Sequence, residues 1–262
     1  MIKMKYLIAI DSDGTLRHSD GSISYETKKV INELINRGNV VVLCTARPRY
    51  HALNISDEVG IKDYLISSNG TEIYDYINDE VLYGYYLPKY VIKKIYEDSK
   101  KYNIRVVFVC DNKEYVSMFT RNDYQILLSD DNVSELVNSK IKQIMIIGED
   151  KTKILDYKKR IINDYRLKII DSSNPFKNEV WFSIINSKSS KGNALLKLSK
   201  YLKIPRKNII SIGNDINDLS MFDISGVSVC VNNAEEEIKK VCDIVTLSND
   251  EDGVFKYLST LL

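Results

Sequence analysis

Short apolar runs that stop at polar residues recur along the chain. Tyr6–Ile10, Val40–Cys44 and Tyr64–Ser67 each have the length and composition of a buried strand. Between the first two, Tyr25–Arg37 carries apolar residues at helical spacing, and Gly38 is a natural helix stop. The order of strand, helix, strand, loop and strand predicts a parallel sheet with crossover helices.

The same alternation returns near the C-terminus. The first helix there has its apolar residues on one face, the second is ended by Gly226, and the third is a charged helix. The predicted elements are helices at Lys191–Leu202, Asn217–Ser225 and Glu235–Val241 and strands at Ile209–Ile212, Val227–Val231 and Ile244–Thr246.

The middle of the chain has a different pattern, in which strands follow one another directly and are typical of antiparallel pairing. The pattern predicts an α/β protein whose Rossmann-like parallel sheet core, residues 1–82 and 187–262, is interrupted by an inserted α+β domain at 83–186. The expected elements of the insertion are helices at Tyr90–Tyr102, Val133–Ser139 and Lys151–Tyr165 and strands at Arg105–Cys110, Glu114–Phe119, Gln143–Ile147, Arg166–Ile170 and Glu179–Ile185.

Composition narrows the class of protein. The 37 lysine and arginine residues nearly cancel the 36 aspartate and glutamate residues, which argues against nucleic acid or an anionic membrane as the main partner. No apolar run approaches the roughly 20 residues of a membrane span. The four cysteines are scattered without metal-ligand spacing, which favours reduced thiols and a cytoplasmic protein. No pattern specifies an oligomeric state.

Polar residues follow three of the predicted strands: Asp11, Thr45 and Asn214. Because the carboxyl ends of parallel strands form the ligand-binding edge of such a sheet, these residues are expected at one site. Asp11 and Asp13 are two apart in the sequence DSDGT, so both can face one pocket. Two close carboxylates repel unless a cation lies between them, and Mg²⁺ suits such a pair. The alternative is a polar turn that caps a strand.

Three further motifs extend this group. In TAR, Thr45–Arg47, a hydroxyl and backbone amides suit a phosphate oxygen, although Thr45 is also a plausible helix cap. In SKGNAL, Lys191 opens a helix whose N-terminus already favours anions, so a nearby negative charge is expected; the alternative is a solvated lysine. In GNDIND, Gly213–Asp218, the acids and amides exceed what one helix cap requires.

Together these groups indicate phosphoryl transfer. A carboxylate that attacks a phosphate dianion meets repulsion of about 8 kcal/mol at an effective dielectric constant near 20. A divalent cation and Lys191 are the available means of reducing this barrier.

The set DSDGT, TAR, SKGNAL and GNDINDLSMF, in this order, resembles the haloacid dehalogenase (HAD) superfamily. The long insertion between the second and third motifs, preceded by SSNGT, is similar to that of the Cof-like phosphatases, which carry a C2B-type cap. The C-terminal sequence from VSVCVNNAEEE onward also resembles that subgroup, so the resemblance covers nearly the whole chain.

The resemblance implies a role for each matching residue. Asp11 would be the nucleophile that forms an aspartyl-phosphate, and Asp13 would act as general acid and then general base. Asp11 and the backbone carbonyl of Asp13 would bind Mg²⁺. The residues expected to hold the phosphoryl oxygens are Ser12, Thr45, Ala46, Lys191 and Asn217, and the insertion would close over the site and select the substrate.

Two positions depart from the family pattern. Ser12 replaces a bulky apolar residue, but only its backbone is needed. More important, the first aspartate of the common Gly-Asp-x-x-Asn-Asp pattern, a metal ligand, falls on Asn214. Either this carboxamide binds the metal weakly, or Asp215 or Asp218 supplies the carboxylate; we expect Asp218 to matter and Asp215 to be the better substitute ligand.

The resulting hypothesis is a Mg²⁺-dependent phosphatase that removes phosphate from small phosphorylated metabolites, such as sugar phosphates, through an aspartyl-phosphate. A phosphomutase or phosphotransferase would use the same intermediate. A third alternative is a phospholigand-binding regulator with weakened catalysis, which Asn214 favours but the retained Asp11, Asp13 and Lys191 disfavour.

Overall fold

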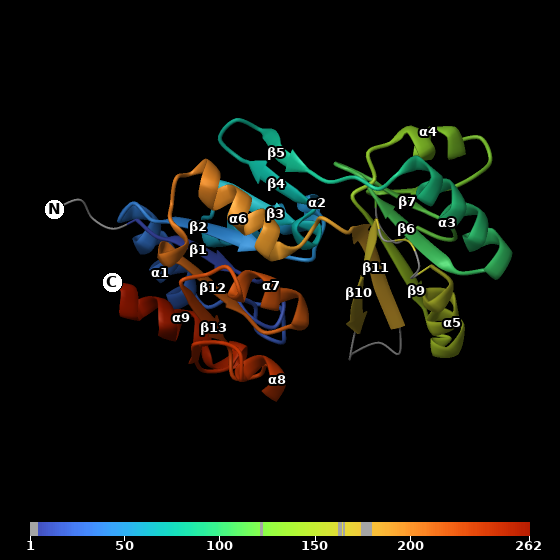
Figure 1. The fold of residues 1–262 in the computed structure, drawn as a ribbon. Coiled ribbons are helices and arrows are strands. Elements are labelled where there is room, and N and C mark those ends of the chain that lie inside the picture. Colours follow the sequence, from blue (N-terminus) through green and yellow to red (C-terminus); the bar gives the residue numbers. More distant parts are fainter. Residues whose placement is uncertain (1–4, 121–122, 162–163, 165, 174–179) are drawn as a thin grey trace. The chain divides into compact units, whose positions relative to one another are not determined.

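The structure is a computed structural model that describes residues 5–120, 123–161, 164, 166–173 and 180–262 (Figure 1). The chain divides into two compact units. The first contains Met1–Tyr83 and Ser190–Leu262, and the second contains Gly84–Ser189. Each unit has its own hydrophobic core.

The first unit is built on an eight-stranded sheet in the order β14-β13-β12-β1-β2-β3-β4-β5. The pairs from β14 to β3 are parallel, whereas β4 is antiparallel to β3. The strands are β1 (Leu7–Ile10), β2 (Val40–Cys44), β3 (Tyr64–Ser67), β4 (Glu72–Asp75), β5 (Glu80–Gly84), β12 (Ile209–Gly213), β13 (Val227–Cys230) and β14 (Ile244–Val245).

Both faces of this sheet are covered by helices, which is why its central strands are uniformly apolar. On β1, Ile8 and Ile10 pack into one core cluster with α1, α2 and α9, while Leu7 and Ala9 pack into the other with α6, α7 and α8. The helices are α1 (Tyr25–Asn36), α2 (Arg49–Val59), α6 (Lys191–Tyr201), α7 (Leu219–Phe222), α8 (Glu236–Lys239) and α9 (Gly253–Leu258).

The strand order places the functional motifs. From β1 the chain adds β2 and β3 on one side, whereas β12, β13 and β14 lie on the other side of β1, so the order in which strands are added reverses between β1 and β12. Ile10 is level with both Leu43 and Ile212 in the strand register. The residues that follow these strands therefore emerge side by side at the switch point, where open α/β sheets bind ligands.

The second unit is an α+β module with a six-stranded sheet in the order β10-β11-β9-β6-β7-β8. All its pairs are antiparallel except β7 with β8. Its strands are β6 (Arg105–Val109), β7 (Glu114–Val116), β8 (Gln125–Leu127), β9 (Gln143–Gly148), β10 (Leu167–Ser173) and β11 (Val180–Asn186), and its helices are α3 (Lys89–Tyr102), α4 (Val133–Asn138) and α5 (Lys151–Ile161).

The predicted fold class is confirmed: a parallel α/β core accompanies a module with antiparallel pairs. The sequence interpretation was wrong for Arg49–Val59, taken as a loop, which is helix α2 with Ala52, Ile55 and Val59 buried on one face. It also missed β4, β5, β8 and α9, which are short or carry charged residues among their apolar ones. Residues 162–163, 165 and 179, at the ends of two predicted elements, lie outside the described residues.

In the part of the chain that the structure describes, no helix combines the length and the apolar character that crossing a membrane requires.

Candidate active site

The loop after β1 gives its two aspartates different surroundings. The Asp11 amide donates to the Ile212 carbonyl at 2.9 Å, which continues the ladder between β1 and β12. The Asp11 residue is only 6% exposed, whereas the Asp13 side chain is 51% exposed. Gly14 has a φ of +75°, which allows the chain to turn back immediately after Asp13. Asp11 therefore lies in the base of the site and Asp13 at its rim.

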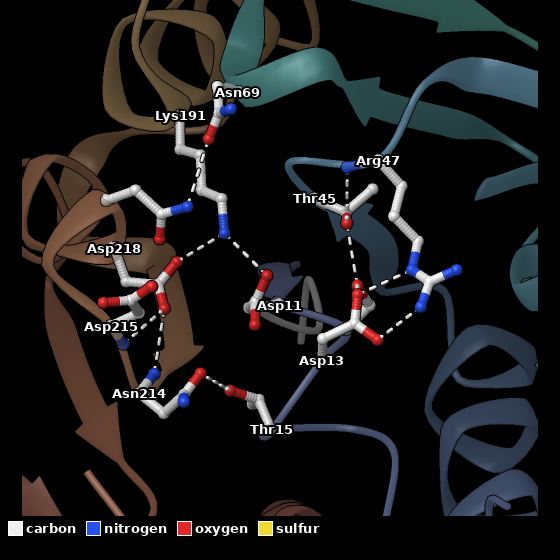
Figure 2. Close-up of polar contacts among 12 residues, drawn as sticks. Asp11, Asp13, Thr15, Thr45, Arg47, Asn69, Lys191, Asn214, Asp215 and Asp218 are labelled. Carbon is white, nitrogen blue, oxygen red and sulfur yellow. Dashed lines mark hydrogen bonds and ion pairs between the residues drawn. The ribbon is translucent and has the colours of Figure 1, made fainter. Parts of the chain in front are cut away.

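Lys191, the first residue of α6, lies between two buried carboxylates (Figure 2). Its Nζ is 2.6 Å from Oδ1 of Asp11 and 2.6 Å from Oδ1 of Asp218, and its side chain is 1% exposed. Lys191 is thus not a solvated lysine. One ammonium shared by two carboxylates leaves a net negative charge in this buried group.

The pKa values in this group reflect that imbalance. Burial lowers the pKa of Lys191, but the carboxylates of Asp11 and Asp218 raise it more, so the side chain stays protonated. Burial raises the pKa of Asp11 to about 7. The charge of Lys191 acts to lower this pKa, but repulsion from the Asp218 carboxylate opposes it. A cation beside Asp11 would favour its ionised form.

Both carboxylate oxygens of Asp218 are bonded to other groups of the protein. In addition to the Lys191 contact of Oδ1, its Oδ2 accepts hydrogen bonds from the backbone amides of Asn214 at 2.9 Å and Asp215 at 3.0 Å. The side chain is fully buried. Asp218 consequently orders the loop after β12 and orients Lys191.

Asn214 and Asp215 lie in different environments. Oδ1 of Asn214 accepts a hydrogen bond from the hydroxyl of the buried Thr15 at 2.8 Å, so this carboxamide faces the DSDGT loop. Asp215 is exposed, and its Oδ1 accepts from the Ile216 amide at 2.7 Å as the cap of a 3₁₀ turn, Ile216–Asp218. Figure 2 shows this hydrogen bond between Thr15 and Asn214.

Arg47 forms a bidentate ion pair with Asp13. Its Nε and Nη2 donate to the two carboxylate oxygens at 2.6 and 2.7 Å, and Arg17 adds a contact at 3.3 Å. Burial alone would raise the pKa of Asp13, but the hydrogen bonds and charge of Arg47 lower it below its usual value. The sequence interpretation gave Arg47 no role. Its position in TAR, two residues after Thr45 at the end of a predicted strand, could have indicated that its side chain lies at the site.

The hydroxyl and amide groups of DSD and TAR meet at the ends of β1 and β2. The hydroxyl oxygens of Ser12 and Thr45 are 2.7 Å apart, and Thr45 Oγ1 accepts from the Arg47 amide at 3.1 Å. Within the described part of the chain, the backbone amides of Ser12 and Ala46 donate no hydrogen bond. These amides are available to an anionic oxygen.

Asn217 contacts a residue that the sequence interpretation did not single out. Its Nδ2 donates to Oδ1 of Asn69 at 3.1 Å, while its own Oδ1 is buried without a hydrogen-bond partner among the described residues. Asn69 belongs to SSNGT, which was interpreted only as a turn and a family feature.

The metal ligands that the family resemblance implies are all oxygen atoms: the Asp11 carboxylate, the backbone carbonyl of Asp13 and the carboxamide of Asn214. Such oxygen donors are what Mg²⁺ takes. Across the described ranges, no three histidine, cysteine, aspartate or glutamate side chains group as a metal site. The donor set fits Mg²⁺ with one carboxylate fewer than the common pattern.

Comparison with known proteins identifies the family. A family model for haloacid dehalogenase-like hydrolases matches residues 8–258. The chain belongs to this family. The 5-amino-6-(5-phospho-D-ribitylamino)uracil phosphatase YitU of Bacillus subtilis is 29% identical over 97% of this chain and 96% of its own length. Phosphatase YwpJ of the same organism is 29% identical over 98% and 99% of the two chains.

Solved structures of this family have the same fold. A haloacid dehalogenase-like hydrolase from Bacteroides thetaiotaomicron superposes with a TM-score of 0.88 at 25% identity, over 99% of this chain and 100% of that one. A sugar phosphatase of HAD subclass IIB superposes with a TM-score of 0.81 at 19% identity, over 98% and 99% of the two chains. The resemblance noted from the four motifs is confirmed, and this HAD-family enzyme is of the phosphatase class.

Proposed function

We propose that this HAD-family phosphatase hydrolyses small phosphomonoesters with Mg²⁺ and an aspartyl-phosphate on Asp11. The observation that carries the proposal is the Asp11 carboxylate, buried at the switch point of the sheet and 2.6 Å from the Lys191 ammonium. A buried carboxylate beside a fixed cation is a nucleophile placed where the charge of a phosphoryl group is compensated.

In the first half-reaction, an oxygen of Asp11 attacks phosphorus, an acyl-phosphate bond forms and the ester P–O bond breaks. The proton that the departing alkoxide needs comes from Asp13. Arg47 holds Asp13 as a carboxylate by two hydrogen bonds and lowers its pKa, so Asp13 must leave this ion pair and take up a proton before it can protonate the leaving group.

In the second half-reaction, Asp13 takes a proton from a water molecule that attacks phosphorus, and the bond to Asp11 breaks. Inorganic phosphate leaves and the Asp11 carboxylate is restored. Through both steps the phosphoryl oxygens would be held by the amides of Ser12 and Ala46, the Thr45 hydroxyl, the Lys191 ammonium and the Asn217 carboxamide.

Mg²⁺ would be held by Asp11, the Asp13 carbonyl and Asn214, where it supplies charge compensation for the phosphoryl group. Asn214 is better supported as the third ligand than Asp215 or Asp218. Its carboxamide faces the loop that carries Asp11, whereas Asp215 is exposed and the oxygens of Asp218 are bonded to Lys191 and two amides.

The substrate class is a small phosphorylated metabolite, and a sugar phosphate or sugar-alcohol phosphate is the first choice. The relatives support this choice, since several are phosphatases of a phosphorylated ribitylamino compound. We propose that the unit Gly84–Ser189 is the substrate-selecting cap and that the protein acts in the cytoplasm, without nucleic-acid or membrane partners.

Phosphate release from an aryl phosphate tests the proposal. Wild type should release phosphate only with Mg²⁺, and Asp11→Asn should lose activity by at least about 10³-fold because a carboxamide is not a competent nucleophile. The panel should include hexose and alditol phosphates. A wild type inactive on every ester would refute the proposal, and product formed only with an acceptor alcohol or sugar would identify a phosphotransferase or mutase.

The metal ligand is tested by replacing Asn214. Asn214→Asp adds a charged oxygen in a nearly isosteric side chain, so the Mg²⁺ concentration for half-maximal activity should fall about tenfold. Magnesium binding measured by calorimetry gives the same comparison without turnover. Asp215→Ala is the control and should leave the Mg²⁺ affinity unchanged; a loss of affinity in Asp215→Ala would show that Asp215 supplies the carboxylate instead.

A further inference from the structure

The turn between β3 and β4 has an unusual backbone. Ser68, Asn69 and Gly70 have consecutive positive φ angles of 49°, 58° and 81°. Residues other than glycine and asparagine rarely adopt this region, so Ser68 in particular is held there by its surroundings. All three are buried, with at most 1% of Ser68 and Asn69 exposed.

This turn is bonded to the segment that follows β2. The Ser68 amide donates to the carbonyl of Arg47 at 2.9 Å, and the Asn69 amide donates to the carbonyl of Thr45 at 3.0 Å. The turn therefore holds the backbone of Thr45 and Arg47, the two residues of TAR whose side chains belong to the site.

The same turn packs directly on the start of α6. A Cβ on Gly70 would lie 2.1 Å from the carbonyl oxygen of Ser190 and 2.8 Å from the amide nitrogen of Lys191, so only glycine fits. Because Ser190 is the N-cap of α6, the turn also fixes the backbone from which Lys191 extends.

The Asn69 side chain reaches the third site segment. Its Oδ1 accepts one N–H of the Asn217 carboxamide at 3.1 Å, and that amide group has a second N–H to donate. The Oδ1 of Asn217 has no hydrogen-bond partner among the described residues. The contact with Asn69 is therefore what turns the NH₂ end of the Asn217 carboxamide, and not its oxygen, toward Asn69.

We propose that Asn69 is a positioning residue that orients Asn217 so that its second N–H is presented to the phosphoryl group. The proposal rests on the proposed function and assigns a role to a residue outside the four motifs. Without Asn69 the carboxamide of Asn217 can rotate and present its oxygen, an acceptor that repels phosphoryl oxygens. Phosphate binding and turnover should then both weaken.

The informative variant is Asn69→Gly, because glycine adopts a positive φ without strain and removes only the side chain. The dissociation constant of inorganic phosphate, measured by calorimetry with saturating Mg²⁺, should rise on the order of tenfold, the effect of a lost hydrogen bond to a charged group. kcat/KM for an aryl phosphate should fall by a similar factor. Thr71→Val is the matched control, since its buried hydroxyl has no hydrogen-bond partner in the described structure.

A double-mutant cycle separates positioning from general loosening of the turn. In an Asn217→Ala background, Asn69→Gly should have no further effect on phosphate affinity or kcat/KM, because the group it orients is gone. If the effects of the two single variants on phosphate affinity and kcat/KM multiply in the double variant, the proposal is wrong. It is also wrong if Asn69→Gly binds phosphate as tightly as wild type. If Asn69→Gly does not fold, as judged by its melting curve, Asn69→Ser tests the same loss of the carboxamide.

The outcome is separable from that of the proposed function. Wild type that neither binds phosphate nor releases it from esters would refute the function itself. If wild type binds phosphate and releases it from esters, but Asn69→Gly and Asn217→Ala have independent effects, only the positioning role of Asn69 is refuted.

Discussion

At the scale of single residues, the site depends on one lysine. The Lys191 ammonium contacts both Asp11 and Asp218, and all three side chains are nearly inaccessible to solvent. Burying three charges is unfavourable unless each has a partner, so the loss of one partner exposes the others to the full desolvation penalty. The same contacts that prepare Asp11 for catalysis therefore also contribute to the stability of the fold.

Lys191→Met tests this dual role. The free energy of unfolding, measured by urea denaturation at pH 8 without divalent cations, should fall by about 3–5 kcal/mol because two buried carboxylates lose their counter-ion. Lys200→Met, an exposed position on the same helix, is the control and should change stability by less than about 0.5 kcal/mol. Similar stabilities for the two variants would show that Lys191 does not compensate Asp11 and Asp218 energetically.

At the scale of elements, the turn between β3 and β4 joins the ends of β2 and α6 to a common support. Gly70 is the contact point, because its φ is +81° and a Cβ placed on it would lie 2.1 Å from the carbonyl oxygen of Ser190, which leaves no room for a side chain. Gly38, which follows α1, has a comparable φ of +89° but no atom within 4 Å of its Cβ position. An alanine at Gly38 would meet backbone strain alone, whereas an alanine at Gly70 would meet both backbone strain and a steric clash.

Gly38→Ala should lower the free energy of unfolding by about 1–2 kcal/mol, the usual penalty for an alanine in the left-handed region. Gly70→Ala should lose that amount and at least about 2 kcal/mol more, because the turn must move away from α6. Urea denaturation of both variants provides the comparison. Equal losses would indicate that the turn yields without disturbing the helix start.

Element prediction succeeded where burial produces a simple pattern. The strands Val40–Cys44 and Tyr64–Ser67 were both predicted with the bounds that the structure has, and all their residues are buried except the half-buried Tyr64. Helix α2 was missed because it carries polar residues such as Asn54, Asp57 and Glu58 between its buried positions, and its N-cap Pro48 makes no side-chain hydrogen bond.

At the scale of the whole molecule, the second unit has its own core. The cluster includes Ile92 of α3, Phe108 of β6, Ile146 of β9 and Phe182 of β11, each at most 2% exposed. The unit is continuous in sequence from Gly84 to Ser189, so no covalent connection is broken inside it when it is excised. A compact, continuous unit with its own core has the features from which independent folding is expected.

Residues 84–189 expressed alone should fold. The fragment should show a single cooperative urea transition by circular dichroism and dispersed amide resonances by NMR, because, among the described residues, its apolar cluster contains only residues of this unit. A broad, non-cooperative transition or collapsed resonances would show that the unit depends on the remainder of the protein. The complementary control is full-length protein, in which the same resonances should be found.

The sequence by itself determined the α/β core and the group of chemical residues at the carboxyl ends of its strands. Apolar runs and their polar endings are local properties that the chain order converts into one sheet edge. Only the tertiary structure decided how these residues pair. Lys191 and Asp11 are 180 positions apart, yet their contact, the burial of Asp218, the turn of Asn214 toward Thr15 and the Asn69–Asn217 bond all depend on strand order and loop packing. Spacing along the chain carries no information about such contacts, because each arises where segments distant in sequence meet.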